Sequence, residues 1–281
     1  MKDTNCCDHL KKVPELLAPA GGTEALIAAV QNGADAVYLG LSFFNARAAA
    51  ENFTLDSLPK WLDYAHLRGV RVHITINTLL KDTELDEAAE LALTADKMGA
   101  DAFIVQDIGL ASRLRGKIKA KMHASTQMTV YNTEGLRTLQ ELGFSRAVLA
   151  RELSLGEIKR LSRAGIMETE VFCHGALCIS YSGQCMLSRF TCGRSGNRGT
   201  CSQPCRLKYA SVNDSLFENL MSPADLCSLS YINELASTGV SSLKIEGRLK
   251  SPEYTAAVTA AYRKALDDTE AVTQKDIDDL T

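Results

Sequence analysis

Cysteines are the residues of this chain whose type and spacing point most directly to chemistry. Six of the nine cysteines fall between residues 170 and 209, in a segment rich in glycine and serine. Residues 1–12 contain no apolar signal core, and no run of eighteen apolar residues occurs in the chain. We therefore expect a cytoplasmic protein with no membrane partner, in which thiols bind a metal or an iron–sulfur cluster instead of forming disulfides.

The spacing of these cysteines favours a cluster over zinc. Cys178 and Cys185 are separated by six residues and Cys201 and Cys205 by three, whereas structural zinc sites favour tight pairs on both sides. Iron–sulfur clusters need converging thiolates and follow no single sequence spacing. We predict a 4Fe-4S cluster bound by Cys178, Cys185, Cys201 and Cys205. Cys227 is the alternative fourth ligand, and zinc is the alternative metal.

Three blocks of sequence around these cysteines resemble a known family. Residues 170–188 read EVFCHGALCISYSGQCMLS, residues 197–206 read NRGTCSQPCR, and residues 242–248 read SLKIEGR. In residue types and spacing, these blocks resemble the signature of the peptidase U32 family, long described as collagenase-like proteases. The resemblance extends over roughly residues 13–265.

The resemblance implies hydroxylation more than proteolysis. The better understood members of this family are iron–sulfur proteins that hydroxylate RNA bases or a quinone precursor without molecular oxygen, with prephenate as the oxygen donor. Residues 193–199 are most similar to the members that act on an rRNA cytidine or on the tRNA wobble uridine. The resemblance therefore predicts an iron–sulfur-dependent, oxygen-independent RNA hydroxylase whose partners are RNA and a small dicarboxylic molecule.

Two other functions stay open. A collagenase-like peptidase needs an activated nucleophile, yet the chain has neither a Gly-x-Ser-x-Gly nor a His-Glu-x-x-His motif, which leaves Cys178 with His174. A zinc-binding module that recognises RNA would need only structural metal.

The net charge of −3 gives no overall nucleic-acid signal. RNA contact would therefore need a local basic patch, for which the candidates are Arg194, Arg198, Arg206 and Lys208.

A repeated pattern of short apolar runs and helical segments surrounds the cysteine segment. Glycines typical of helix ends precede six of the runs, at positions 33, 69, 99, 143, 165 and 239. The runs predict eight strands, at 14–18, 36–39, 70–76, 102–105, 120–126, 146–150, 169–173 and 242–246. We predict an α/β fold, a (β/α)8 TIM-like barrel with a Cys-rich insertion between strands seven and eight. An open doubly wound sheet is the alternative.

The domain boundaries follow from this pattern. Residues 1–12 are predicted to be an N-terminal tail, 13–268 the barrel domain with the insertion at 174–222, and 269–281 a C-terminal tail. Two further strands are expected within the insertion, at 207–212 and 216–221. Because the acidic end of the chain leads to no further element, we expect a truncation before further domains.

A barrel also predicts where the site lies, because active sites form at the C-terminal ends of its strands. The predicted catalytic residues are Arg47, His123, Gln127, Glu246 and Arg248, and the predicted cofactor-binding residues are Asn45, Asn77, His174 and Lys244. Guanidinium groups suit the carboxylates of a donor or the phosphates of RNA, although they also pair with acids at a barrel rim. His123 lies inside a strand, where a hydrogen-bonded core histidine is the alternative interpretation.

Overall fold

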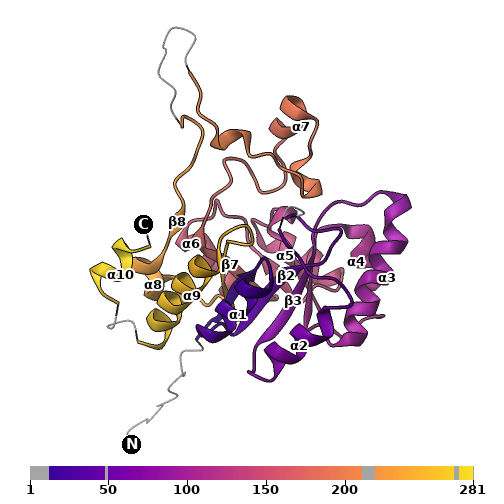
Figure 1. The fold of residues 1–281 in the computed structure, drawn as a ribbon, viewed down its shortest axis with the longest axis horizontal. Coiled ribbons are helices and arrows are strands. Elements are labelled where there is room, and N and C mark those ends of the chain that lie inside the picture. Colours follow the sequence, from indigo (N-terminus) through magenta and orange to yellow (C-terminus); the bar gives the residue numbers. More distant parts are fainter. Residues whose placement is uncertain (1–12, 48–49, 211–218, 269–271, 281) are drawn as a thin grey trace, which may run out of the picture.

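The predicted strands and helices alternate along the chain in the computed structural model, which describes residues 13–47, 50–210, 219–268 and 272–280 (Figure 1). The first half contains β1 (Glu15–Ala20), α1 (Thr23–Gln31), β2 (Ala36–Gly40), α2 (Leu58–His66), β3 (Arg71–Ile76), α3 (Asp82–Met98), β4 (Ala102–Val105), α4 (Ile108–Leu114) and β5 (Lys121–Ala124). The second half contains the short 3-10 helix η1 (Thr126–Met128), α5 (Thr133–Glu141), β6 (Arg146–Val148), α6 (Leu155–Arg163), β7 (Glu168–Gly175), α7 (Leu187–Cys192), η2 (Gly196–Arg198), η3 (Pro204–Arg206), β8 (Leu226–Cys227), η4 (Leu229–Tyr231), α8 (Ile232–Ser237), β9 (Ser242–Ile245), α9 (Pro252–Asp267) and α10 (Gln274–Asp278). The tail predicted over residues 1–12 lies outside the described residues.

Local sequence explains where the helices begin and end. In α6, the Ser154 hydroxyl accepts a hydrogen bond from the Glu157 amide, and the Glu157 carboxylate accepts one from the Ser154 amide, which is a complete capping box. The six glycines at predicted helix ends all have φ between 67° and 105°. A side chain would strain this left-handed conformation, so glycine allows the chain to leave a helix and enter the next strand.

Eight parallel strands close into a barrel. They pair in the order β1–β2–β3–β4–β5–β6–β7–β9, and β9 pairs back onto β1. The predicted (β/α)8 barrel is therefore confirmed. A ninth strand, β8, runs antiparallel to the end of β7, with His174 opposite Cys227 and Gly175 opposite Leu226.

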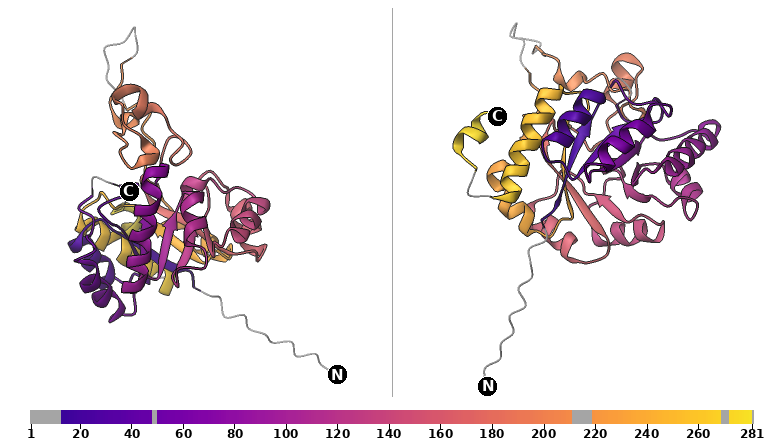
Figure 2. Two further views of the ribbon diagram at one scale, coloured as in Figure 1. Left: turned by 90° about the vertical axis from the view of Figure 1, so that its right-hand side faces the viewer. Right: turned by 60° about the horizontal axis from the view of Figure 1, so that its bottom comes forward.

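The segment between β7 and β8 forms a lobe, whose described residues are 176–210 and 219–225, that stands above the barrel and carries α7 (Figure 2). Of the two strands predicted here, residues 207–210 contribute only an isolated bridge at Tyr209, and residues 219–221 contain no strand. Residues 211–218 lie outside the described range. The 3-10 helix η3 directly precedes residue 207.

The strands separate an apolar outer core from a charged interior. Alternate strand residues face opposite sides, so Leu16, Leu39 and Phe103 pack outward against the helices, whereas Leu17 and Tyr38 belong to a separate small apolar cluster. The interior also contains buried acidic and basic side chains. Buried charges are tolerated only when they are paired.

Arg146 and Lys244 pair with the buried acids of the interior. Arg146 Nη1 lies 2.5 Å from a Glu15 oxygen and 3.2 Å from a Glu170 oxygen, and Lys244 Nζ lies 3.0 Å from the other Glu170 oxygen. The exposed fraction of Glu170 is 0%. Burial alone would raise the pKa of Glu170, but Lys244 and Arg146 outweigh it and lower that pKa to about 2.

We predict that the change Arg146→Met destabilises the barrel by about 3–5 kcal/mol, because it leaves buried carboxylates without their partner. Urea unfolding followed by circular dichroism at neutral pH measures the loss. The matched control is Arg113→Met, which breaks an exposed ion pair with Asp86 and should lower the free energy of unfolding far less. Equal small losses in both variants would contradict the assignment.

Glu170 should also make stability depend on pH. Its folded-state pKa of about 2 lies below the ordinary value of 4.5 for a glutamate, so the ionised carboxylate stabilises the fold above pH 4.5. This contribution is lost as pH falls from 4.5 toward 2. The unfolding free energy of the Glu170→Gln variant should therefore vary less with pH in that window than that of the wild type. Parallel curves for the two proteins would rule out this role.

Candidate active site at the barrel mouth

A pocket lies between the C-terminal ends of the strands and the lobe. Tyr38 on β2, Thr75 on β3, Phe172 on β7 and Lys244 on β9 line its barrel side. Lobe residues around Gly196 line the opposite side. Because (β/α)8 enzymes place their active sites at this end of the strands, this pocket is the candidate active site.

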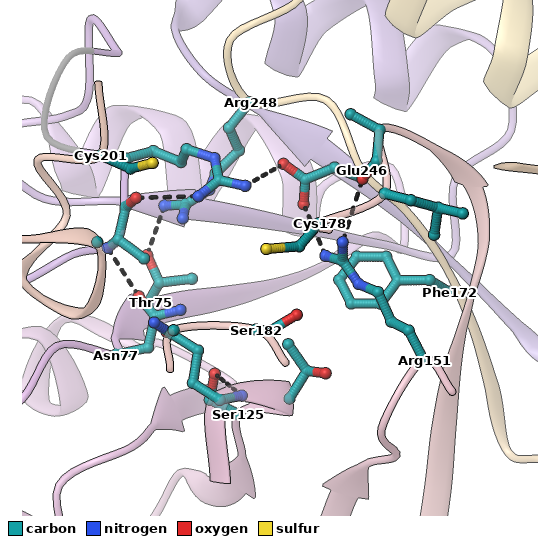
Figure 3. A pocket seen from close by; sticks show the side chains of 18 of the residues that line it. Thr75, Asn77, Ser125, Arg151, Phe172, Cys178, Ser182, Cys201, Glu246 and Arg248 are labelled. Atoms are coloured by element: carbon teal, nitrogen blue, oxygen red, sulfur yellow. Dashed lines mark hydrogen bonds and ion pairs between the residues drawn. The ribbon is translucent and has the colours of Figure 1, made fainter. Parts of the chain in front are cut away.

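A carboxylate held between two arginines forms part of the pocket wall (Figure 3). Arg47 Nη2 lies 2.8 Å from one oxygen of Glu246, and Arg151 Nη2 lies 3.8 Å from the other. Burial alone would raise the pKa of Glu246, but Arg47, Arg151 and Arg248 together lower it to about 2. Glu246 is therefore ionised at neutral pH and fixes both guanidinium groups at the pocket.

Arg248 is a buried cation with no acidic partner among the described residues. Only 5% of its surface is exposed. Its Nη1 donates to Thr75 Oγ1 at 2.8 Å and to Asn45 Oδ1 at 3.4 Å, and its Nε has no partner. Burial lowers the pKa of Arg248 to about 10, so the group still carries its charge at neutral pH. An anion that enters the pocket would meet an uncompensated guanidinium.

Lys244 connects the pocket to the charged interior of the barrel. Its Nζ lies 4.4 Å from the centre of the Tyr38 ring and 5.6 Å from that of Phe172. Burial lowers the pKa of Lys244, and Glu170 opposes this shift. The ion pair with Glu170 thus occupies Lys244, whereas the Nε atoms of Arg248 and Arg151 have no hydrogen-bond partner among the described residues.

The four cysteines predicted to bind the cluster all line this pocket: Cys178, Cys185, Cys201 and Cys205. In Figure 3, the labelled Cys178 and Cys201 lie around the same space as Glu246 and Arg248. Burial raises the pKa of the Cys205 thiol, and the other three thiols add to the rise while Arg206 opposes it. The four sulfur atoms are therefore close enough to influence one another.

Backbone amides already point at two of these sulfurs. The Leu187 amide donates to Cys185 Sγ at 3.4 Å, and the Gln203 amide donates to Cys201 Sγ at the same distance. Such hydrogen bonds are typical of cluster-binding thiolates. Within the described ranges, however, no three His, Cys, Asp or Glu side chains form a ready metal site. The donor set thus fits a cluster in chemistry, but the thiols are not assembled into a cage.

Cys227 has different surroundings. It lies on β8 beside the end of β7 and does not line the pocket. Burial raises the pKa of the Cys173 thiol, to which the Cys227 thiol adds a smaller contribution, so these two cysteines are neighbours.

Contacts with the barrel hold the lobe over the pocket. Arg198 donates to both oxygens of Glu84, at 2.8 and 2.5 Å, and to the Leu79 carbonyl at 2.7 Å. This hydrogen-bonded pair lowers the pKa of Glu84 to about 2. At Gly199, with φ of 77°, a Cβ atom would lie 2.2 Å from the Asn45 carbonyl oxygen. The lobe backbone therefore approaches the barrel at a distance that only glycine permits.

Six of the nine predicted catalytic and cofactor-binding residues line the pocket: Arg47, Asn77, Gln127, Lys244, Glu246 and Arg248. Asn45 lies beneath them and shapes the β2 loop, because its side chain bonds the Leu41 carbonyl and the Arg47 amide. His123 lies deeper, inside the barrel, with its ring centre 4.9 Å from that of His73. Burial lowers the pKa of His123 well below its usual value, so the ring is neutral.

His174 faces away from the pocket. The pairing of β7 with β9 is irregular between Phe172 and His174. The His174 ring packs on Tyr254 and Tyr262, and burial lowers its pKa to about 4. None of the described residues that line the pocket is a histidine, so a peptidase pair of Cys178 with His174 does not form there.

Among the pocket residues that were not predicted are Tyr38, Thr75 and Phe172. They lie within strands, whereas the predicted residues were polar ones near or beyond strand ends. The signal that identifies them is the alternation of strand residues, since Phe172 lies two positions after the interior Glu170.

Comparison with known proteins identifies a family and individual relatives to which this chain is similar. The sequence model of peptidase family U32 matches residues 21–280. The chain is 41% identical over 258 residues to the 23S rRNA 5-hydroxycytidine C2501 synthase of Escherichia coli (strain K12), which covers 90% of this chain and 39% of that protein. It is 36% identical over 270 residues to tRNA hydroxylation protein P1 of Bacillus subtilis, covering 92% and 64%. A protein named Collagenase from Porphyromonas gingivalis is 35% identical over 272 residues, covering 90% and 65%.

The chain thus spans between 39% and 65% of the length of these relatives. A solved structure from Coccidioides immitis, described as a possible fructose-1,6-biphosphate aldolase, has a TM-score of 0.51 at 11% identity and covers 96% of this chain and 91% of that one. This likeness concerns the barrel fold alone. In the described residues, no helix has the length and apolar character needed to cross a membrane. The match to the family model over residues 21–280 shows that the chain belongs to peptidase family U32.

Proposed function

We propose that this chain is an iron–sulfur-dependent hydroxylase of an RNA base that takes its oxygen atom from a small dicarboxylate, for which prephenate is the candidate. The observation that carries the proposal is one pocket lined both by four cysteines and by an uncompensated arginine. The relatives named for rRNA hydroxycytidine synthesis and tRNA hydroxylation support an RNA substrate, either an rRNA cytidine or a tRNA uridine. A cytoplasmic location agrees with both RNA and free thiols.

Cys178, Cys185, Cys201 and Cys205 would hold the 4Fe-4S cluster. When bound, such a cluster supplies one-electron redox chemistry whose potential depends on hydrogen bonds to its sulfurs. The amides that donate to Cys185 and Cys201 would serve that purpose. Because the thiols share a pocket without forming a cage, we expect binding to draw the lobe together, as metal binding commonly orders its ligands.

The barrel side of the pocket would hold the donor. A carboxylate beside Arg248 would fill its free hydrogen-bonding capacity and compensate its buried charge. Arg47 and Arg151 are kept in place by Glu246 and can meet a second carboxylate. Gln127, whose Oε1 has no partner, offers an acceptor to a hydroxyl group of the donor or to a base.

The collagenase-like alternative has less support at this site. A peptidase needs a nucleophile with an adjacent base, and the described residues that line the pocket include no histidine. The relative named Collagenase is 35% identical to this chain, and tRNA hydroxylation protein P1 is 36% identical. Sequence identity therefore does not favour the peptidase.

Mass spectrometry of nucleosides tests the proposed function. Ribosomal and transfer RNA from cells with the gene should contain a hydroxylated cytidine or uridine that is missing after its deletion. Expression of the gene from a plasmid in the deletion strain should restore the modified nucleoside. Identical nucleoside profiles in both strains would overturn the proposal.

We predict that alanine at any one of the four pocket cysteines lowers bound iron and sulfide strongly, because a cluster that loses one of its four ligands is held less firmly. The measurement is iron and acid-labile sulfide per chain, with the visible absorbance, after anaerobic purification. The matched controls are Cys192→Ala and Cys227→Ala, which should retain the cluster. Zinc in place of iron would support the binding-module alternative, and unchanged iron in two of the four variants would reject the ligand set.

We predict that Arg248→Met lowers hydroxylation by about a hundredfold or more, because a preorganised donor to a charged group is removed from a buried site. Cluster absorbance should stay unchanged, since no thiolate is altered. Modified nucleoside measured in a deletion strain that expresses the variant gives the readout, and Arg113→Met, at an exposed position, controls for expression. Normal modification at normal protein level would limit Arg248 to a structural role at the barrel rim.

A further inference from the structure

The lobe differs in charge from the rest of the chain. Between residues 171 and 213 the sequence contains five Lys and Arg residues and no Asp or Glu. The whole chain carries 31 basic and 34 acidic residues, so the remainder is clearly acidic. Local positive charge on an acidic protein indicates a partner that is itself negative.

The structure divides these five cations into two groups. Arg198 is bound to Glu84, and Arg206 donates to the Leu177 and Pro223 carbonyls, so both stabilise the lobe itself. Arg189, Arg194 and Lys208 are exposed. Neither Arg194 nor Lys208 has a side-chain partner within the described part of the chain. Arg194 and Lys208 are therefore free to meet an anion, whereas Arg189 Nη1 donates to the Gly193 carbonyl at 2.9 Å and keeps its other nitrogens at the exposed surface.

An exposed aromatic ring lies among these cations. Phe190 on α7 is 83% exposed, although burying a phenylalanine is strongly favourable. Met186, one turn earlier, is 54% exposed, and Tyr181 on the same lobe is 49% exposed. Aromatic rings beside basic side chains are the usual means of binding single-stranded nucleic acid, because bases stack on the rings while phosphates meet the cations.

We propose that the outer surface of α7 and of the turn after it, formed by Phe190 with Arg189 and Arg194, binds an unpaired segment of RNA next to the nucleotide that enters the pocket. The inference rests on the proposed RNA substrate and adds the surface that holds it. Lys208, on the same lobe, extends the basic surface. Because other residues of the same lobe line the pocket, a strand stacked on α7 would lie close to the nucleotide that enters it.

Compensation of cluster charge is the competing explanation for the missing acids, since four thiolates are negative. It accounts for cations that face the pocket, such as Arg206. It does not account for Arg194 or for Phe190, which are exposed to solvent. The two explanations make different predictions for the binding of RNA.

Fluorescence anisotropy with the anaerobically purified holoprotein separates them. The probes are a labelled single-stranded 12-nucleotide RNA of mixed sequence and its duplex. Phe190→Ala should weaken single-strand binding by about tenfold, the scale of one lost stacking contact. Phe190→Leu should bind as weakly, because leucine keeps apolar volume without a ring face. Arg194→Gln should lower the slope of log affinity against log salt by about 0.7, the value for one phosphate contact on a single strand.

Matched changes at the opposite end of the barrel give the controls. Leu67→Ala removes an exposed apolar side chain that precedes β3, and Arg115→Gln removes an exposed cation that precedes β5. Both should bind RNA as the wild type does. Iron content should be normal in all these variants.

The outcomes distinguish this inference from the proposed function. If the wild type binds RNA and the Phe190 and Arg194 variants bind it equally well, the proposed α7 surface would be overturned and the proposed function would stand. The exposed residues of α7 would then be a contact surface for another macromolecule. Equal affinity of Phe190→Leu and wild type would overturn base stacking. Wild-type protein that binds neither probe and modifies no RNA would overturn both proposals. Loss of iron in Arg194→Gln would favour charge compensation and overturn the phosphate contact.

Discussion

The structure depends on one constraint, that charges taken into a barrel must be paired where water cannot reach them. Arg146 is matched by Glu15 and Glu170 near the lower end of the strands, and Glu170 also meets Lys244. Each pair joins two strands: Arg146 connects β6 to β1 and β7, and Lys244 connects β9 to β7. At the mouth Glu246 pairs with Arg47 and Arg151, whereas Arg248 has no acidic hydrogen-bond partner among the described residues. The described part of the barrel thus presents more basic than acidic side chains at the end where a ligand can enter.

One strand and its extension build this arrangement. On β9 and the residues that follow, Ser242, Lys244, Glu246 and Arg248 alternate toward the interior. Within β9 the spacing of Ser242 and Lys244 follows from the pleat of a strand, and Glu246 and Arg248 continue it in the residues that follow the strand. The block SLKIEGR therefore encodes a column of polar groups that rises from the base of the barrel to the pocket. The apolar residues between them, Leu243 and Ile245, pack outward against the helices.

Much of the fold follows from sequence because its signals are local. Apolar runs and glycines at helix ends identify all eight barrel strands, and the barrel then places Arg47, Gln127 and Arg248 at one mouth. The position of His174 does not follow, because an irregularity in pairing with β9 turns its ring toward α9. Ion pairs between residues distant in sequence, such as Arg198 with Glu84, likewise cannot be predicted from the sequence alone, because the fold brings the partners together.

The short strand β8 has a consequence of its own. By pairing with the last residues of β7, it brings the departure and the return of the lobe to the same point on the barrel. The lobe therefore leaves and rejoins the barrel at one point, so its length and sequence can change without moving any barrel strand. Such an architecture allows the cover of the pocket to change independently of the charged column beneath it.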